Sequence, residues 1–244
     1  MKIRSNHIGI MLFVVLFNNC TSSKKPNSTG TDTLAYNQDA MLMDLYLSDE
    51  IKPSPDYYDR IARDIYKIKN KYYEEYSDIL RIGFRFPYVH NELLMAFDDT
   101  TTQKVKAGEY HDWDSLNAEY SLVELYDHTD FYELQFECCS HMYYLAPLYG
   151  KLPGVRYVNR NWTNEPNSNI YPKVKGDTLT YFYKHGWECS LAGGCANYEF
   201  LYIRSYRKIV EIVGYWNYKE HPNYPEWWDE AYQNVNDYWD TLWK

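Results

Sequence analysis

The segment from residue 91 to residue 160 alternates between strand and helix signals in an order that few small folds accommodate. Runs rich in β-branched and aromatic residues indicate strands, and apolar residues three or four apart indicate helices. The segment therefore reads strand, helix, strand, strand, helix, strand. The six elements lie at residues 92–97, 100–107, 120–126, 131–138, 140–149 and 154–159. This order predicts a ferredoxin-like βαββαβ region.

Helical signals precede this region. Residues 54–56, Ser-Pro-Asp, are typical of a helix start because they combine a capping residue, a proline and an acid. Apolar residues then recur three or four apart up to about residue 77, which predicts an amphipathic helix. Residues 35–48 are compatible with either a helix or an extended chain.

The C-terminal part reads differently. Residues 162–176 are rich in Asn, Pro, Ser and Lys, and we interpret them as a loop. Three strands follow, at 177–185, 196–206 and 208–215, and they predict an antiparallel β-meander. Residues 225–243 carry an apolar stripe at helical spacing and predict a closing helix.

The N-terminus reads as an export signal. Lys2 and Arg4 precede an uncharged apolar run of ten residues, 8–17. A helix that spans a bilayer needs about 20 apolar residues, so this run is typical of the core of a secretory signal peptide. The residues up to Cys20 resemble a bacterial lipobox, which makes Cys20 the expected lipid anchor. The polar composition of residues 21–32 predicts a flexible tether.

These signals divide the chain into five parts and predict an α+β protein. Residues 1–19 are the predicted signal peptide, and residues 20–33 are the tether. An N-terminal helical segment at 34–86 and the ferredoxin-like region at 87–161 follow. Residues 162–244 add the meander and the C-terminal helix, and we expect them to pack with the preceding region as one unit.

The net charge limits the classes of partner that we expect this chain to bind. The net charge is −9, and removal of residues 1–19 takes away two basic residues and makes it −11. Nucleic acid needs a basic surface, so we expect no nucleic-acid partner. An acidic surface also disfavours electrostatic adhesion to anionic lipid. The lipid on Cys20 is therefore the expected attachment to the membrane, in the cell envelope, facing the periplasm or the cell surface.

Four cysteines remain once Cys20 is assigned to the anchor, and an exported protein forms disulfides. Cys189 and Cys195 enclose a short loop of small residues and are the favoured pair. Cys138 and Cys139 are adjacent, so on a strand they would face opposite sides. Either one of them pairs with the 189–195 region, or both stay reduced and buried.

Two segments resemble known families. Residues 152–161, Leu-Pro-Gly-Val-Arg-Tyr-Val-Asn-Arg-Asn, resemble the last strand of subtilase propeptide and inhibitor-like domains, and residues 87–94 are similar to their first strand. Residues 186–195 resemble a Gly-Trp-Cys hairpin of uncharacterised secreted lipoproteins of Bacteroidota. The first resemblance implies contact with a protease, and the second implies fold and secretion. The candidate binding residues are Tyr157, Asn159, Asn161, Trp162 and Trp187.

Three groups of side chains are candidates for metal binding or catalysis. The candidate metal ligands are His111, Asp112 and Asp114 in one run, and His185, Cys189 and Cys195 around the hairpin. The first group lacks a second histidine, and the second lacks a fourth ligand. Cys139 lies two residues before His141, but the end of an apolar strand favours burial over nucleophilic catalysis. We therefore predict no catalytic residue, no metal and no cofactor.

The aromatic composition leaves three functional hypotheses open. The chain has 28 Tyr, 8 Trp and 9 Phe, and such residues suit strands and binding faces alike. The first hypothesis is a non-catalytic binding or protease-inhibitor-like lipoprotein. The second is a glycan- or peptide-binding surface protein that uses exposed rings, among them Trp187, Trp216, Trp227 and Trp228. The third is an enzyme of unrecognised type, which a deep pocket with convergent polar groups would indicate.

Overall fold

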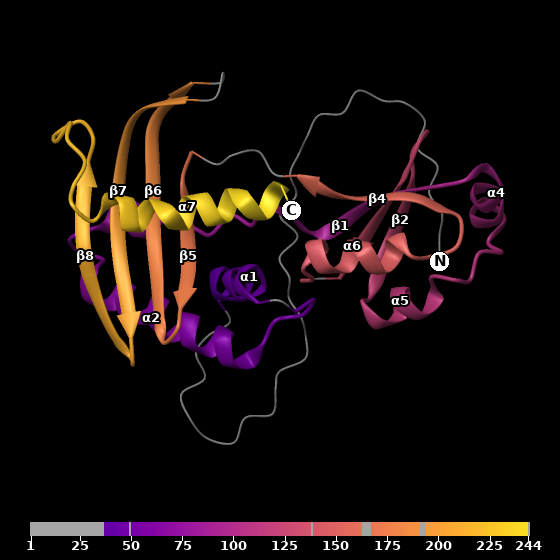
Figure 1. The fold of residues 1–244 in the computed structure, drawn as a ribbon, viewed down its shortest axis with the longest axis horizontal. Helices are drawn as coiled ribbons and strands as arrows, with labels where there is room; N and C mark the ends of the chain where they lie inside the picture. Colours follow the sequence, from indigo (N-terminus) through magenta and orange to yellow (C-terminus); the bar gives the residue numbers. More distant parts are fainter. Residues whose placement is uncertain (1–36, 49, 138, 163–166, 191–193, 244) are drawn as a thin grey trace. The chain divides into compact units, whose positions relative to one another are not determined.

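The computed structural model describes residues 37–48, 50–137, 139–162, 167–190 and 194–243. Within them lie seven helices and two four-stranded sheets, which confirms the predicted α+β class (Figure 1). The contacts divide the chain into two compact units. The first unit contains Glu50–Lys52 and Tyr88–Asn161, and the second contains Leu34–Asp49, Pro53–Pro87 and Trp162–Lys244.

The first unit has the predicted ferredoxin-like order. Its elements are β1 (Tyr88–Phe97), α4 (Asp99–Ala107), α5 (Asp114–Glu119), β2 (Leu122–Asp127), β3 (Tyr132–Phe136), α6 (Met142–Gly150) and β4 (Val155–Trp162). The strands are ordered β2-β3-β1-β4, and β3 pairs antiparallel with both β1 and β2. This is the strand order that the βαββαβ signal predicts.

Alternation along the strands builds the core of this unit. Leu93, Met95 and Leu134 are fully buried and form one hydrophobic cluster with residues of α4 and α6. The residues next to them in the strands, such as Glu92 and Glu133, belong to the opposite face because successive side chains alternate. The helices therefore cover one face of the sheet, and the other face carries polar side chains.

The stability of the first unit is expected to fall in mild acid because of His90 in β1. Burial lowers the pKa of His90 from 6.5 to about 4. Between these two values the unfolded chain binds a proton that the folded chain excludes, so folding loses free energy as the pH falls. We expect a loss of about 1–2 kcal/mol from about pH 7 to about pH 5 that a His90→Gln variant does not show. Urea unfolding at both pH values measures this difference, and a His90 resonance that titrates near its ordinary pKa would contradict it.

The second unit is a four-stranded meander with helices on both faces. Its elements are α1 (Gln38–Leu47), α2 (Pro55–Tyr72), α3 (Ser77–Leu80), β5 (Asn169–Lys175), β6 (Thr178–Ser190), β7 (Gly194–Tyr206), β8 (Ile209–Asn217) and α7 (Trp228–Trp243). The strand order β5-β6-β7-β8 follows the chain, and neighbouring strands are antiparallel. The predicted meander and C-terminal helix are confirmed.

Two adjacent residues of β6 show how the helices are placed. The hydroxyl of Tyr181 donates to Asp64 of α2 at 3.0 Å. The amide of Asn234 in α7 donates to the hydroxyl of Thr180 at 3.1 Å. Neighbouring side chains of a strand point to opposite faces, so α2 and α7 cover opposite faces of the sheet. Figure 1 shows α7 crossing the strands on one of them. Residues 179–183 are consequently all buried, without alternation.

The structure of this unit corrects one interpretation of the sequence and decides another. Residues 162–176, which we interpreted as a loop, contain the strand β5 at the edge of the sheet. Its Pro172 obscures the strand signal, because proline lacks an N–H and is tolerated mainly in edge strands. Residues 35–48, which were ambiguous, contain helix α1, capped by the Asn37 side chain. By its contacts, the meander belongs to the same compact unit as the N-terminal helices.

Candidate binding groove

One groove in the second unit is lined mainly by aromatic rings. It lies between strands β6 to β8 and helix α7, and its volume is about 430 Å³. The lining residues are Lys184, Cys195, Ala196, Tyr198, Phe200, Trp216, Tyr218, Tyr224, Trp228, Tyr232 and Val235. Seven of the eleven are aromatic, so rings and tyrosine hydroxyls dominate the surface that a ligand would meet. The volume lies within the range of small-molecule sites, about 300–1,000 Å³.

The floor of the groove is a pair of cross-strand rings. Phe200 of β7 lies opposite Trp216 of β8, and their ring centroids are 5.4 Å apart. Both rings are buried, with exposed fractions of 6% and 4%. The indole N–H of Trp216 donates to the carbonyl of His221 at 2.8 Å. Trp216 therefore holds the segment after β8 in place and also contributes its ring to the floor.

One wall is a row of stacked rings, Tyr224, Trp228 and Tyr232, which we call the ring row. Neighbouring centroids are 4.7 Å and 5.2 Å apart. The spacing of four residues brings Trp228 and Tyr232 to one face of α7. Tyr224 is 63% exposed and Tyr232 is 40% exposed. The ring row is thus held by its own stacking and stays accessible to solvent.

The start of α7 is fixed to the sheet at a glycine. A Cβ atom on Gly214 of β8 would lie 1.9 Å from Nε1 of Trp227. The Trp227 ring occupies that space and stacks on Tyr202 at 5.9 Å. The hydroxyl of Tyr202 donates to Glu230 at 3.1 Å. These contacts set the position of α7, and an isolated glycine in a strand pattern is their only sequence signal.

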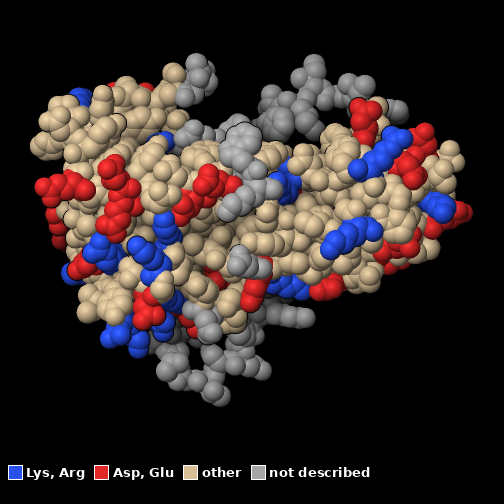
Figure 2. Space-filling view, viewed as in Figure 1, with Lys and Arg blue, Asp and Glu red and all other residues tan. Residues whose placement is uncertain are grey.

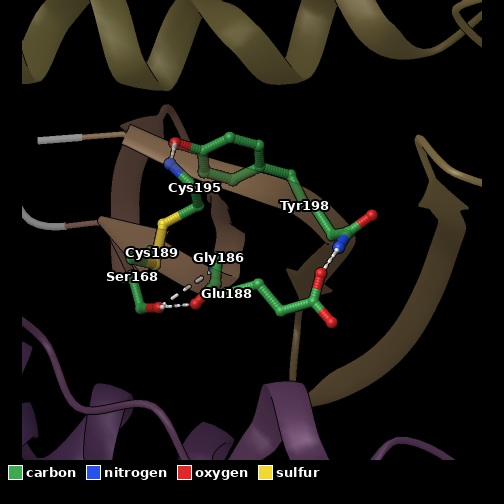
Figure 3. Close-up of a disulfide and its surroundings, with 7 residues drawn as sticks. Ser168, Gly186, Glu188, Cys189, Cys195 and Tyr198 are labelled. Atoms are coloured by element: carbon green, nitrogen blue, oxygen red, sulfur yellow. Dashed lines mark hydrogen bonds between the residues drawn. A yellow bond between two sulfur atoms is a disulfide. The ribbon is translucent and has the colours of Figure 1, made fainter.

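Cys195, at one end of the groove lining, forms the predicted disulfide with Cys189 (Figure 3). The two residues pair directly across β6 and β7. The backbone N–H of Cys195 donates to the hydroxyl of Tyr198 at 3.3 Å. A Cβ atom on Gly186 would lie 2.8 Å from the Cys195 sulfur, so the close approach of the strands requires glycine. The disulfide thereby positions one end of the aromatic lining.

The bonding state of Cys139 matches neither of the two alternatives predicted for Cys138 and Cys139. Cys189 and Cys195 bond to each other, so neither accepts Cys138 or Cys139. Cys139 is itself disulfide-bonded, so it carries no free thiol and is no nucleophile for a reaction with His141. The adjacent Cys138 and the expected lipid anchor Cys20 lie outside the described residues.

The four candidate tryptophans separate into different roles. Trp228 lines the groove, and Trp216 does so as a buried floor residue, so Trp216 is not the exposed ring we expected. Trp227 packs on Gly214 behind the ring row. Trp187 is half-buried beside His185, with ring centroids 5.8 Å apart, and is not among the lining residues.

The residues predicted to contact a protease lie on β4, outside the groove. Tyr157 and Asn159 are exposed, and Trp162 is 42% exposed. The amide of Asn161 donates to Glu92 at 2.8 Å. Contact with a protease stays a prediction for this strand.

The candidate metal ligands form ordinary polar pairs. His111 Nδ1 lies 2.9 Å from Asp114, and both side chains are exposed at the start of α5. His185 Nδ1 lies 2.7 Å from Glu199, whose other oxygen accepts from the Tyr215 hydroxyl at 2.7 Å. In the part of the chain that the structure describes, no group of three or more His, Cys, Asp or Glu is arranged to hold a metal.

Comparisons with protein-family models, with curated proteins and with solved structures give no match for this chain. Among the described helices, none is long and apolar enough to cross a membrane. The chemistry of the groove is therefore the basis on which a function can be proposed.

Proposed function

We propose that this chain is a non-catalytic binding protein whose aromatic groove holds an extended, proline-rich peptide segment. The observation that carries the proposal is the accessible ring row above a fixed aromatic floor. Aromatic-lined grooves bind proline-rich peptides in the polyproline II conformation, because that conformation is already ordered before binding and its proline rings pack on aromatic faces.

The polar groups of the groove favour a peptide over a glycan. None of the described residues that line it carries a carboxylate or a side-chain amide. The polar side-chain atoms are tyrosine hydroxyls, the indole N–H groups of Trp216 and Trp228 and the Lys184 ammonium, all of which can donate hydrogen bonds. A proline-rich peptide offers carbonyl acceptors and few N–H donors. A sugar offers many donors as well, and they would lack strong acceptors in this lining.

The spacing of the rings is consistent with such a ligand. Neighbouring rings of the row are 4.7 Å and 5.2 Å apart. A polyproline II helix advances about 3 Å per residue, or about 6 Å per two residues. One turn of the peptide, three residues or about 9 Å, would therefore extend along the row, against the ring edges that the stacking leaves uncovered. The Lys184 ammonium, 5.1 Å from the Tyr198 ring centroid, stands at the disulfide end.

The proposal includes the compartment expected from the sequence, a lipid-anchored position in the cell envelope. The Cys189–Cys195 disulfide supports it, because disulfides persist in oxidising compartments. The anchor places the groove where secreted or surface polypeptides are available. The inhibitor-like function predicted for β4 concerns other residues and remains a separate prediction.

A matched pair of tyrosine variants tests the groove. Tyr224 and Tyr66 are 63% and 60% exposed, but only Tyr224 lines the groove. We expect an oligoproline peptide to bind the wild-type protein, and Tyr224→Ala to weaken binding by about tenfold, the effect of a good aromatic contact. Tyr66→Ala should bind like wild type. Isothermal titration calorimetry measures all three affinities.

Two results would contradict the proposal. In the first, the peptide does not bind, or it binds equally well to the Tyr224→Ala variant. In the second, oligosaccharides bind at the groove and the peptide does not, which would make the site correct and the ligand class wrong. Tyr66→Ala should unfold within about 0.5 kcal/mol of wild type. Tyr224→Ala should cost about 1–2 kcal/mol, because it loses its ring contacts with Trp228 and Trp216, and the protein stays folded for the titration.

A further inference from the structure

A second hollow of the same unit lies on the α2 side of the sheet. Its volume is about 220 Å³, and it is bounded by α2 and two β-turns. One turn joins β5 to β6 at Asp177, and the other joins β7 to β8 at Arg207 and Lys208. Five of the eight lining residues are basic, and we call this hollow the basic pocket. The basic residues are Arg60, Arg63, Lys67, Arg207 and Lys208.

Hydrogen bonds to the two turns hold two of these cations in place. An Nη2–H of Arg60 donates to the carbonyl of Asp177 at 2.6 Å. The ammonium of Lys67 donates to the carbonyl of Lys208 at 2.6 Å. Each head group retains further N–H donors, because guanidinium has five and ammonium three. These two cations are thus positioned by backbone carbonyls of the turns, and neither bond uses all of their N–H donors.

The charge of the pocket is unusual for this chain, whose net charge is −9. Within the described residues, none of the five cations forms an ion pair with a carboxylate. Two carboxylates do line the pocket. Asp64 is 3% exposed and accepts from Tyr181 of the sheet, whereas Asp177 is exposed. In Figure 2, basic side chains lie at the lower left, with acidic side chains among them.

The β7–β8 turn contributes its two cations in a backbone conformation that favours other residues. Arg207 and Lys208 have φ values of 45° and 72°. A two-residue hairpin turn with positive φ at both positions is usually Asn-Gly, because other side chains are disfavoured there. Arginine and lysine therefore stabilise this turn less well than Asn-Gly would, and they add two positive charges to the pocket.

We propose that the basic pocket binds a phosphate group. Arginine forks match the paired oxygens of phosphate, and several cations around one small hollow offset the cost of desolvating it. The phosphate could belong to a soluble phosphate compound or to a phospholipid headgroup. The pocket shares no lining residue with the aromatic groove, so this inference does not depend on the proposed function.

The test uses a variant that removes charge without removing the bonds to the turns. Arg63→Gln with Lys208→Gln changes two exposed side chains of the pocket. Lys69→Gln with Lys219→Gln removes the same charge away from the pocket, on another face of α2 and in the segment after β8. Calorimetry with inorganic phosphate and pyrophosphate at low salt measures the soluble source. Flotation with phosphatidylcholine vesicles, with and without phosphatidylglycerol, measures the lipid source.

We expect wild type and the control to bind at least one probe, with affinities within about twofold of each other. The pocket variant should bind that probe about tenfold more weakly, the scale of losing two charge-assisted contacts. Thermal unfolding of both variants checks that the unit stays folded. Binding to soluble probes assigns a soluble ligand, and binding to anionic vesicles alone assigns a headgroup. Absence of binding to every probe, or an equal loss in the control, would overturn the inference.

Discussion

Replacing Trp216 with alanine is expected to lower the free energy of unfolding of the second unit by about 3–5 kcal/mol. The ring is 4% exposed and contacts Phe200 and Trp228, with centroid distances of 5.4 Å and 4.9 Å. Its loss removes buried apolar surface, leaves a cavity under the ring row, and deletes the bond to the His221 carbonyl. Urea unfolding followed by circular dichroism measures the change.

Tyr218 supplies the control for this substitution. It also contacts Trp216, with centroids 5.9 Å apart, but it is 52% exposed. Tyr218→Ala should therefore cost less than about 1 kcal/mol. If Trp216→Ala costs no more than Tyr218→Ala, Trp216 is not the buried floor described above.

Substitution of Gly214 by alanine is the second large effect. The added Cβ would lie 1.9 Å from the Trp227 ring, so the ring must leave its place on the sheet. Overpacking of this kind costs about 1–3 kcal/mol. The start of α7 moves with Trp227, so we also expect peptide binding at the ring row to be lost. Chemical unfolding and calorimetry measure the two effects.

A double substitution separates steric conflict from a general weakening of the strand. Trp227→Ala removes the ring that the new methyl group meets. The cost of Gly214→Ala should therefore be smaller in the Trp227→Ala background than in wild type, a coupling typical of residues in contact. Additive costs would show that Trp227 does not pack on Gly214.

The local order of elements was predictable because each signal is short-range. The βαββαβ order depends on patterns within single elements, such as the buried alternation of Leu93 and Met95. Pro172 explains why β5 was missed, since proline indicates a loop unless the strand is known to be at an edge. The Cys189–Cys195 pair was predictable from its short separation.

The groove was not predictable because its parts are distant in the sequence. The stripe containing Trp228 and Tyr232 indicated a buried helix face, and only the meander register brings Phe200 and Trp216 beneath it. The register decides which of the candidate tryptophans line the groove. The role of Gly214 needed the position of Trp227, which no local pattern contains.

The most direct test of the central claim is a nuclear magnetic resonance titration of the tryptophan indole N–H signals with an oligoproline peptide. We predict that the signal of Trp228, which lines the groove, shifts saturably. The signal of Trp113, which is 2% exposed in the core of the first unit, should stay in place. If Trp228 does not shift while the peptide binds, or if the shifts concentrate on β4, the groove is not the binding site.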